Sequence, residues 1–279
     1  MQKISGEEVS RDIIGELKRR AVPKRILAAI SVGDNPASDS FLKRKQVAAG
    51  ELGVDLRLYK LPITLGNDGI RKKVGELGLS KKVGGVILQL PLPTGIDKNY
   101  VVNAIPREKD VDVLSERALG AFWRGRNSVL PPAVGVVNEI LDRQNINLKD
   151  ISVAVVGLGD LVGKPVSVWL SGKCKELTLL DRDSDLEILG RADLIISGVG
   201  CPGVVKSAYL KEGAGVIDFG YYYSPEGKLL GDLETTDDLP EDGFYTPTPK
   251  GTGPILVAKL MENFYKLCED KTTKVKGNV

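Results

Sequence analysis

The sequence predicts an α/β protein of two lobes with mostly parallel sheets. Apolar runs alternate with helical patterns along the chain, many of these runs end in Gly or Asp, and 279 residues exceed the usual size of one domain. Parallel strands need long crossover connections, which the helical stretches between the runs supply. We therefore expect two hydrophobic cores, one in each lobe.

The first lobe is predicted from a βαβ pattern in the first hundred residues. The strand patterns are residues 25–32, 54–61 and 84–93, the last ended by prolines. The helical patterns are residues 6–20, a segment that Ser38 can cap and that continues to about Gly53, and residues 67–77. Parallel pairing of the three strands follows from this alternation.

The second lobe is predicted from four apolar segments that follow a mixed region at about 106–130 and a helical pattern at 134–143. Each of the four ends in Gly or Asp: ISVAVVG, ELTLLD, ADLIISGVG and AGVIDFG. This series predicts a Rossmann-type nucleotide domain, in which ligands bind at the loops that follow the carboxyl ends of the strands. Only the final segment, DKTTKVKGNV, is expected to be disordered.

Composition excludes several classes of protein. The 39 Lys and Arg are balanced by 37 Asp and Glu mixed along the chain, so no basic surface suits nucleic acid. No apolar run approaches the roughly 20 residues that span a bilayer, and the charged N-terminus is unlike a signal peptide, so we expect a cytoplasmic protein without a membrane partner.

The absence of histidine excludes Ser-His-Asp, Cys-His and H-E-x-x-H chemistry and leaves Lys, Asp, Glu, Tyr or Cys as acid or base. Cys174, Cys201 and Cys268 are odd in number and far apart, which argues against a disulfide frame or a metal site.

A glycine turn in the stretch VAVVGLGDLVGKPV is the first candidate binding element. Gly157, Gly159 and Gly163 lie between a predicted strand and a predicted helix, where glycine lets the backbone approach a pyrophosphate. Asp181 ends the next strand, where a carboxylate can bind the adenosine ribose and repel a 2′-phosphate, which favours NAD over NADP. The alternative is a turn that needs glycine only for steric reasons. Asp160 is expected to point to solvent or to cap the helix, because its charge would repel a pyrophosphate.

A second set of polar residues lies in the first lobe. Phe41 and Lys45 are four residues apart on a predicted helix and so share a face. Gln89 ends a buried strand, and KDVDV places Asp110 and Asp112 in a loop about twenty residues later. Taken one by one, these residues have plain structural interpretations, such as a solvated helix face or the end of a strand.

Seven motifs in order make the sequence similar to a known family. They are VGDNPAS, ILQLPLP, EKDVD, GLGDLVGKP, GVGCPG, GVIDFG and TPTPKGTGP. Over residues 5 to 265, the chain resembles the folate-dependent methylenetetrahydrofolate dehydrogenase/cyclohydrolase proteins. The resemblance implies a folate-binding catalytic domain over 1–125, completed by a C-terminal helix at 254–279, and an NAD(P)-binding domain over 126–253, with a cleft between them. It also implies a homodimer.

The resemblance implies a hydride transfer from 5,10-methylene-tetrahydrofolate to a nicotinamide, followed in bifunctional members by hydrolysis of the methenyl product. Lys45 matches the active-site lysine, Gln89 the glutamine that positions it, and Asp112 the aspartate that holds the pterin. Further substrate contacts are expected from Phe41, Leu90, Gly253 and Pro254. The expected cofactor contacts are Gly157, Leu158, Gly159, Gly163, Asp181, Arg182, Gly200 and Pro202.

Departures from the family pattern carry information. Phe41 replaces a tyrosine, so a hydroxyl near the lysine is lost, and we expect hydrolysis to suffer more than hydride transfer. Leu158 and Gly159 replace Arg-Ser, which removes a cation that NADP-using members place near the 2′-phosphate. Asp181 adds repulsion there, while Arg182 can turn to meet that phosphate. The loops DVDV, PPAV and PTPKGTGPIL also differ, which leaves a dehydrogenase for another pterin carrier and a degenerate dinucleotide- or folate-binding regulatory paralogue as alternatives.

Overall fold

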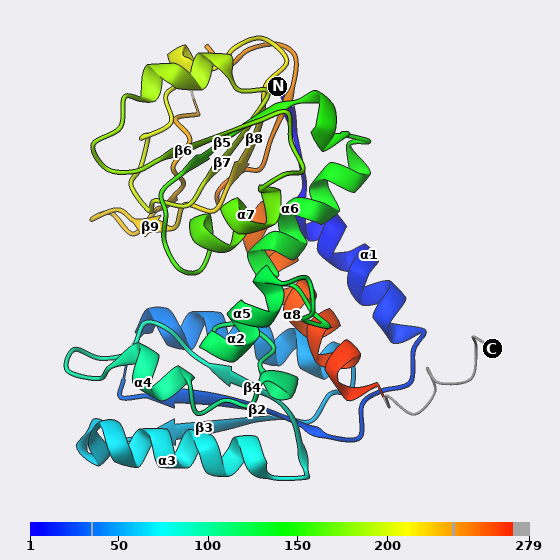
Figure 1. The fold of residues 1–279 in the computed structure, drawn as a ribbon, viewed down its shortest axis with the longest axis vertical. Coiled ribbons are helices and arrows are strands. Elements are labelled where there is room, and N and C mark those ends of the chain that lie inside the picture. The colour runs from blue at the N-terminus through cyan, green and yellow to red at the C-terminus, as the bar shows by residue number, and fades with distance from the viewer. Residues whose placement is uncertain (35, 236–237, 270–279) are drawn as a thin grey trace. The chain divides into compact units, whose positions relative to one another are not determined.

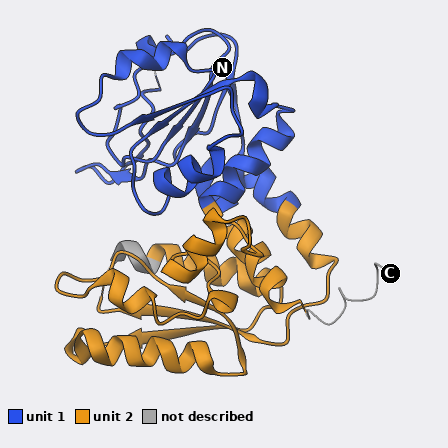
Figure 2. Cartoon of the chain, viewed as in Figure 1, with its two compact units in different colours: residues 1–12, 133–256 blue, residues 13–132, 257–279 orange. Residues whose placement is uncertain are grey.

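The structure, a computed structural model, describes residues 1–34, 36–235 and 238–269, with the backbone alone at residues 36–39 (Figure 1). The chain forms two compact units (Figure 2). Unit 1 contains residues 1–12 and 133–256, and unit 2 contains residues 13–132 and the chain from Val257 onwards. Both units are mixed α/β with a parallel sheet, so the predicted fold class is confirmed.

Unit 2 is built on a three-stranded parallel sheet of order β3-β2-β4. Its strands are β2 (Ile26–Val32), β3 (Leu56–Leu61) and β4 (Val83–Leu88). Its helical elements are α2 (Pro36–Glu51), η1 (Ile63–Leu65), α3 (Gly66–Leu79), α4 (Lys98–Val102), η2 (Arg107–Lys109) and α5 (Glu116–Trp123). Every residue of β2 and β4 is buried, which explains why these strands appear in the sequence as continuous apolar runs.

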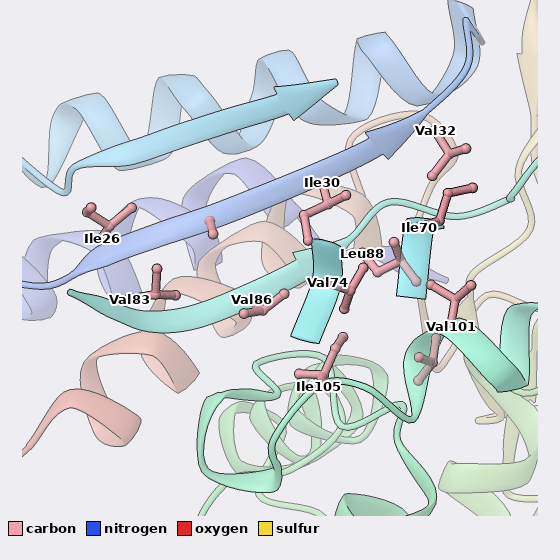
Figure 3. Close-up of a cluster of buried hydrophobic side chains, with 12 residues drawn as sticks. Ile26, Ile30, Val32, Ile70, Val74, Val83, Val86, Leu88, Val101 and Ile105 are labelled. Carbon is pink, nitrogen blue, oxygen red and sulfur yellow. The ribbon is translucent and has the colours of Figure 1, made fainter. Parts of the chain in front are cut away.

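The two faces of this sheet are covered by different helices. On one face, Ile30 and Leu88 pack with Ile70 and Val74 of α3 and Val101 of α4 (Figure 3). On the other, a Cβ added to Gly85 of β4 would lie 2.8 Å from a ring carbon of Phe264, so glycine makes room for helix α8 (Thr252–Cys268).

Unit 1 is built on a six-stranded sheet of order β1-β11-β8-β7-β5-β6 in which every pairing is parallel. Its strands are β1 (Gln2–Lys3), β5 (Ser152–Val156), β6 (Glu176–Leu180), β7 (Leu194–Ser197), β8 (Gly215–Asp218) and β11 (Phe244–Tyr245). A separate antiparallel pair joins β9 (Tyr222–Tyr223) and β10 (Leu229–Leu230). The helical elements are α6 (Pro132–Arg143), η3 (Leu148–Asp150), α7 (Gly163–Leu170), η4 (Leu186–Arg191) and η5 (Ser207–Tyr209), and α1 (Gly6–Lys18) runs from unit 1 into unit 2.

Several expected boundaries differ from the structure. Helix α2 begins at Pro36, so Ser38 lies inside the helix rather than at its cap. The first twelve residues, expected in the first lobe, pack in unit 1, where the two-residue strand β1 pairs with β11. Two-residue strands are too short to show a periodicity, so nothing in the sequence marked them.

The expected disordered tail lies outside the described residues. Within the part of the chain that the structure describes, no helix is both long and apolar enough to cross a membrane.

Candidate active site

Lys45 and Gln89 form the centre of a candidate site in unit 2. Lys45 comes from the middle of α2, and Gln89 follows the last residue of β4, at the carboxyl edge of the sheet. The Lys45 ammonium donates to Gln89 Oε1 at 3.1 Å, while Gln89 Nε2 donates to the Leu90 carbonyl at 2.7 Å. Because both ends of the amide are engaged and Gln89 is only 7% exposed, its oxygen is held toward the lysine.

Asp112 sets the charge of this site. It lies in the loop between η2 and α5. Burial of Lys45 lowers the pKa of its amine, and the negative charge of Asp112 opposes this lowering. Burial in turn raises the pKa of Asp112, with Lys45 opposing and Asp110 adding to the rise. Burial therefore shifts both groups toward their neutral forms, and the neutral form of an amine is the one that can accept a proton.

Asp110 fixes the loop that carries Asp112. Its Oδ2 accepts the backbone N–H of Leu114 at 3.0 Å and of Ser115 at 2.7 Å, and Ser115 caps α5 through the N–H of Ala118. Asp110 is fully buried, and burial raises its pKa against the effect of these hydrogen bonds. Asp110 is therefore a structural residue of the loop, whereas the charge of Asp112 acts on Lys45.

Phe41 and Leu90 are the remaining expected substrate contacts in unit 2. Phe41 lies one turn before Lys45 on α2, is half-buried, and has the Arg44 guanidinium 5.9 Å from its ring centroid. Leu90 is also half-buried, and its carbonyl holds the Gln89 amide. Unit 2 thus contains all five expected residues: Phe41 and Lys45 on α2, Gln89 and Leu90 just after β4, and Asp112 in the loop between η2 and α5.

The glycine turn of unit 1 is closed by a direct backbone approach. Gly157 follows β5 with φ +84°, a left-handed conformation that favours glycine. A Cβ on Gly163, the first residue of α7, would lie only 1.8 Å from the Gly157 carbonyl oxygen, so Gly163 admits no side chain. Gly159 is exposed with open space around it, as an approaching pyrophosphate requires. The geometry of this turn fits a dinucleotide.

The residues expected at the adenosine end are exposed. Asp181 and Arg182 follow β6 and are both exposed, and the Asp181 backbone N–H donates to Ser184 Oγ at 2.9 Å. Leu158 is half-buried in the turn. Asp160 is exposed, as expected, and its Oδ1 accepts from Lys164 Nζ at 2.7 Å, whereas the N-cap position of α7 belongs to Val162.

Asp232 is a residue of this region that the sequence did not reveal. It is fully buried, and its two oxygens accept the Ser197 hydroxyl and three backbone N–H groups, at distances between 2.7 and 2.9 Å. The three N–H groups belong to Val199, Gly200 and Cys201, the turn that contains the expected cofactor contact Gly200. Its only signal in the sequence is an acidic residue next to the leucines of KLLGDL.

A cavity of about 270 Å³ lies beside this turn, wholly within unit 1. Its lining includes Pro202 and Gly203 together with the polar residues Asp218, Glu234, Thr246 and Thr248. Burial raises the pKa of Asp218 to about 6, with the charge of Asp232 adding to the rise. The expected contact Pro202 is therefore at the wall of a polar cavity.

Gly253 and Pro254 lie in the first turn of α8, which begins at Thr252, rather than in a loop. Both belong to unit 1, unlike the lysine site. The Thr252 hydroxyl donates to the Asp218 carbonyl at 2.9 Å, which fixes the start of the helix against β8.

Two family models match the chain. One is described as the tetrahydrofolate dehydrogenase/cyclohydrolase catalytic domain and matches residues 4–112, and the other is described as the NAD(P)-binding domain of the same family and matches residues 131–272. A curated relative from Agathobacter rectalis, named bifunctional protein FolD, is 34% identical over 268 residues, which cover 93% of this chain and 96% of the relative.

Solved structures give the same result. The bifunctional FolD methylenetetrahydrofolate dehydrogenase/cyclohydrolase from Campylobacter jejuni is similar with a TM-score of 0.91 and 30% identity, covering 96% of this chain and 98% of its own. The FolD protein from Trypanosoma brucei, in complex with NADP and an inhibitor, is similar with a TM-score of 0.89 and 27% identity, covering 97% and 98%.

Proposed function

Because this chain belongs to the tetrahydrofolate dehydrogenase/cyclohydrolase family, we propose that Lys45, Gln89 and Asp112 are the residues with which it acts on folate. The chain is a methylenetetrahydrofolate dehydrogenase/cyclohydrolase with an NAD(P)-binding domain. A degenerate binding module and a dehydrogenase for another carrier are not favoured. The observation that carries the residue assignment is the 3.1 Å bond from Lys45 to Gln89 beside the charge of Asp112.

In this proposal, unit 2 binds 5,10-methylene-tetrahydrofolate. Asp112 accepts hydrogen bonds from the N–H groups of the pterin, and Gln89 holds the Lys45 amine beside the reacting carbon. Gly157, Gly159 and Gly163 hold the pyrophosphate of the dinucleotide, whose nicotinamide supplies a hydride acceptor when it is bound. For hydride transfer, the main task of these residues is to align the folate carbon with the nicotinamide ring.

In the hydrolysis step, Lys45 must also take part in proton transfer. The methenyl product is a cation, and burial lowers the pKa of the lysine, so both oppose a positive charge on Lys45. In this proposal the amine accepts one proton as water adds to the methenyl carbon, and the remaining hydroxyl proton passes to N5 as the ring C–N5 bond breaks to give 10-formyl-tetrahydrofolate. Phe41 offers no hydroxyl to hold this water, so we propose that the cyclohydrolase step is weak relative to the dehydrogenase step.

We further propose NAD as the favoured cofactor. Asp181 places a carboxylate where a 2′-phosphate would bind, and Leu158 offers no charge to attract one. Arg182 is the residue that argues for NADP, and the relative from Trypanosoma brucei is described with NADP. A cytoplasmic homodimer likewise stays a prediction, and sedimentation of the purified protein measures its oligomeric state.

One assay tests the function. The purified chain is mixed with 5,10-methylene-tetrahydrofolate and either NAD or NADP, and the methenyl chromophore is followed. We expect its appearance with both and a higher kcat/KM with NAD. Separate addition of methenyl-tetrahydrofolate then measures its decay with and without enzyme. A higher kcat/KM with NADP refutes the cofactor proposal, and fast enzymatic decay refutes the proposed weakness in hydrolysis.

A further inference from the structure

Lys164 is paired with a carboxylate of the glycine turn, which lies beside the end of β6. Its ammonium donates to Asp160 Oδ1 at 2.7 Å, and its backbone N–H donates to the Gly159 carbonyl at 3.0 Å. The lysine is thereby anchored to the turn at its backbone and to Asp160 at its tip. Neither side chain is buried, with 64% of Lys164 and 48% of Asp160 exposed.

Asp181 acts on the same ammonium. The hydrogen bond and charge of Asp160 raise the pKa of Lys164, and the charge of Asp181 adds to this rise. Lys164 and the two carboxylates together carry a net charge of −1. Asp181 is the residue proposed to face the adenosine ribose, so a 2′-phosphate at that ribose would meet this cluster rather than a free cation.

We propose that Lys164 is a specificity-determining residue of the dinucleotide site, because it is a cation on the glycine turn that can meet a 2′-phosphate and its ammonium is held by Asp160 at 2.7 Å. This inference rests on the proposed binding of a dinucleotide at the glycine turn. NADP is then disfavoured because its phosphate must compete with the Asp160 carboxylate for Lys164. Removal of that carboxylate should release the lysine and improve binding of the phosphate, whereas loss of Lys164 should change binding little in the native chain, where Asp160 already holds it.

Binding of two small probes to the full chain tests this proposal. Titration calorimetry with 2′,5′-ADP and with 5′-ADP gives an affinity ratio that reports only on the 2′-phosphate. We expect Asp160→Asn to raise this ratio roughly fivefold, the upper range for an exposed ion pair. Lys164→Met should change the ratio less than about twofold in the native chain but should abolish the gain in the Asp160→Asn background.

Two further variants separate the alternatives. Glu76→Gln removes the carboxylate of an ion pair in unit 2, with Lys73 Nζ at 2.8 Å and similar exposure, and should leave the ratio unchanged. Arg182→Met tests the neighbouring cation. An unchanged ratio in Asp160→Asn, or a gain that survives Lys164→Met but disappears with Arg182→Met, overturns the proposal.

The proposed function fails on different data. Absence of methenyl formation, or a higher kcat/KM with NADP, refutes the proposed activity or the proposed NAD preference. The probe ratio decides the role of Lys164 in either case, because it needs neither folate nor turnover.

Discussion

The glycine turn of unit 1 and the lysine site of unit 2 are built in opposite ways. The turn closes within seven residues, through the contact between the backbone of Gly157 and Gly163. The lysine site joins side chains that are 44 residues apart in the Lys45–Gln89 hydrogen bond, with Asp112 further along the chain. A site made of backbone can be recognised in a short motif, whereas a site made of distant side chains requires the sheet that assembles it.

The sharpest contrast is expected from Lys45→Met. If the distant side chains perform the chemistry, loss of the amine should lower the methenyl hydrolysis rate by about 10²–10⁴-fold, the range for a general base. The decay of methenyl-tetrahydrofolate measures it. Lys43→Met, an exposed neighbour on the same helix, serves as the control. A hydrolysis rate within about threefold of the native rate would remove Lys45 from the chemistry.

Asp232→Asn tests a turn of unit 1 that, unlike the glycine turn, depends on a side chain distant in the sequence. The turn at 198–203 is held by a carboxylate about thirty residues away, through three backbone hydrogen bonds, and Ser197 just before the turn donates a fourth. Loss of this buried charge should lower the free energy of unfolding by about 2–4 kcal/mol. Urea denaturation measures the change, and Asp242→Asn at an exposed position is the control. If Asp232→Asn and Asp242→Asn lower the free energy of unfolding equally, the buried hydrogen bonds of Asp232 do not stabilise the fold more than an exposed carboxylate does.

Gly163→Ala tests the backbone turn itself. A methyl group there would overlap the Gly157 carbonyl, so the turn must open, at about 1–3 kcal/mol of stability. Gly159→Ala adds the same methyl group into open space of the same turn and should cost much less. Thermal and urea unfolding compare the two variants. If both lose the same stability, the close approach at Gly163 is not what the turn depends on.

Phe41→Tyr is expected to give the smallest effect. It restores a hydroxyl one helical turn from Lys45, and we expect hydrolysis to rise several-fold, about 1 kcal/mol in barrier, while the dehydrogenase rate stays nearly constant. The ratio of the two rates in one preparation measures it. A fall in both rates would show that the aromatic ring packs too tightly for the added oxygen.

The features that the sequence predicts are the local ones, and the features that it misses are contacts between residues far apart in the chain. The strands β2, β4, β5, β7 and β8 were identified from their apolar runs because burial on both faces leaves a continuous pattern in the sequence. The pairing of β1 with β11 was not identified, because strands of two residues carry no period and their partners are about 240 residues apart. Asp232 was missed for a related reason, because its hydrogen-bond partners lie about thirty residues away and meet it only through the conformation of a loop.

By itself, the sequence determined the α/β class, the position of the glycine turn and, through the ordered motifs, the family. These features depend on the local period of apolar residues and on residues close together in the chain. Only the tertiary structure decided that residues 1–12 join unit 1, that Gln89 orients toward Lys45, and that Asp160 pairs with Lys164. Burial, charge and hydrogen-bond geometry act through space, and separation along the chain does not specify them.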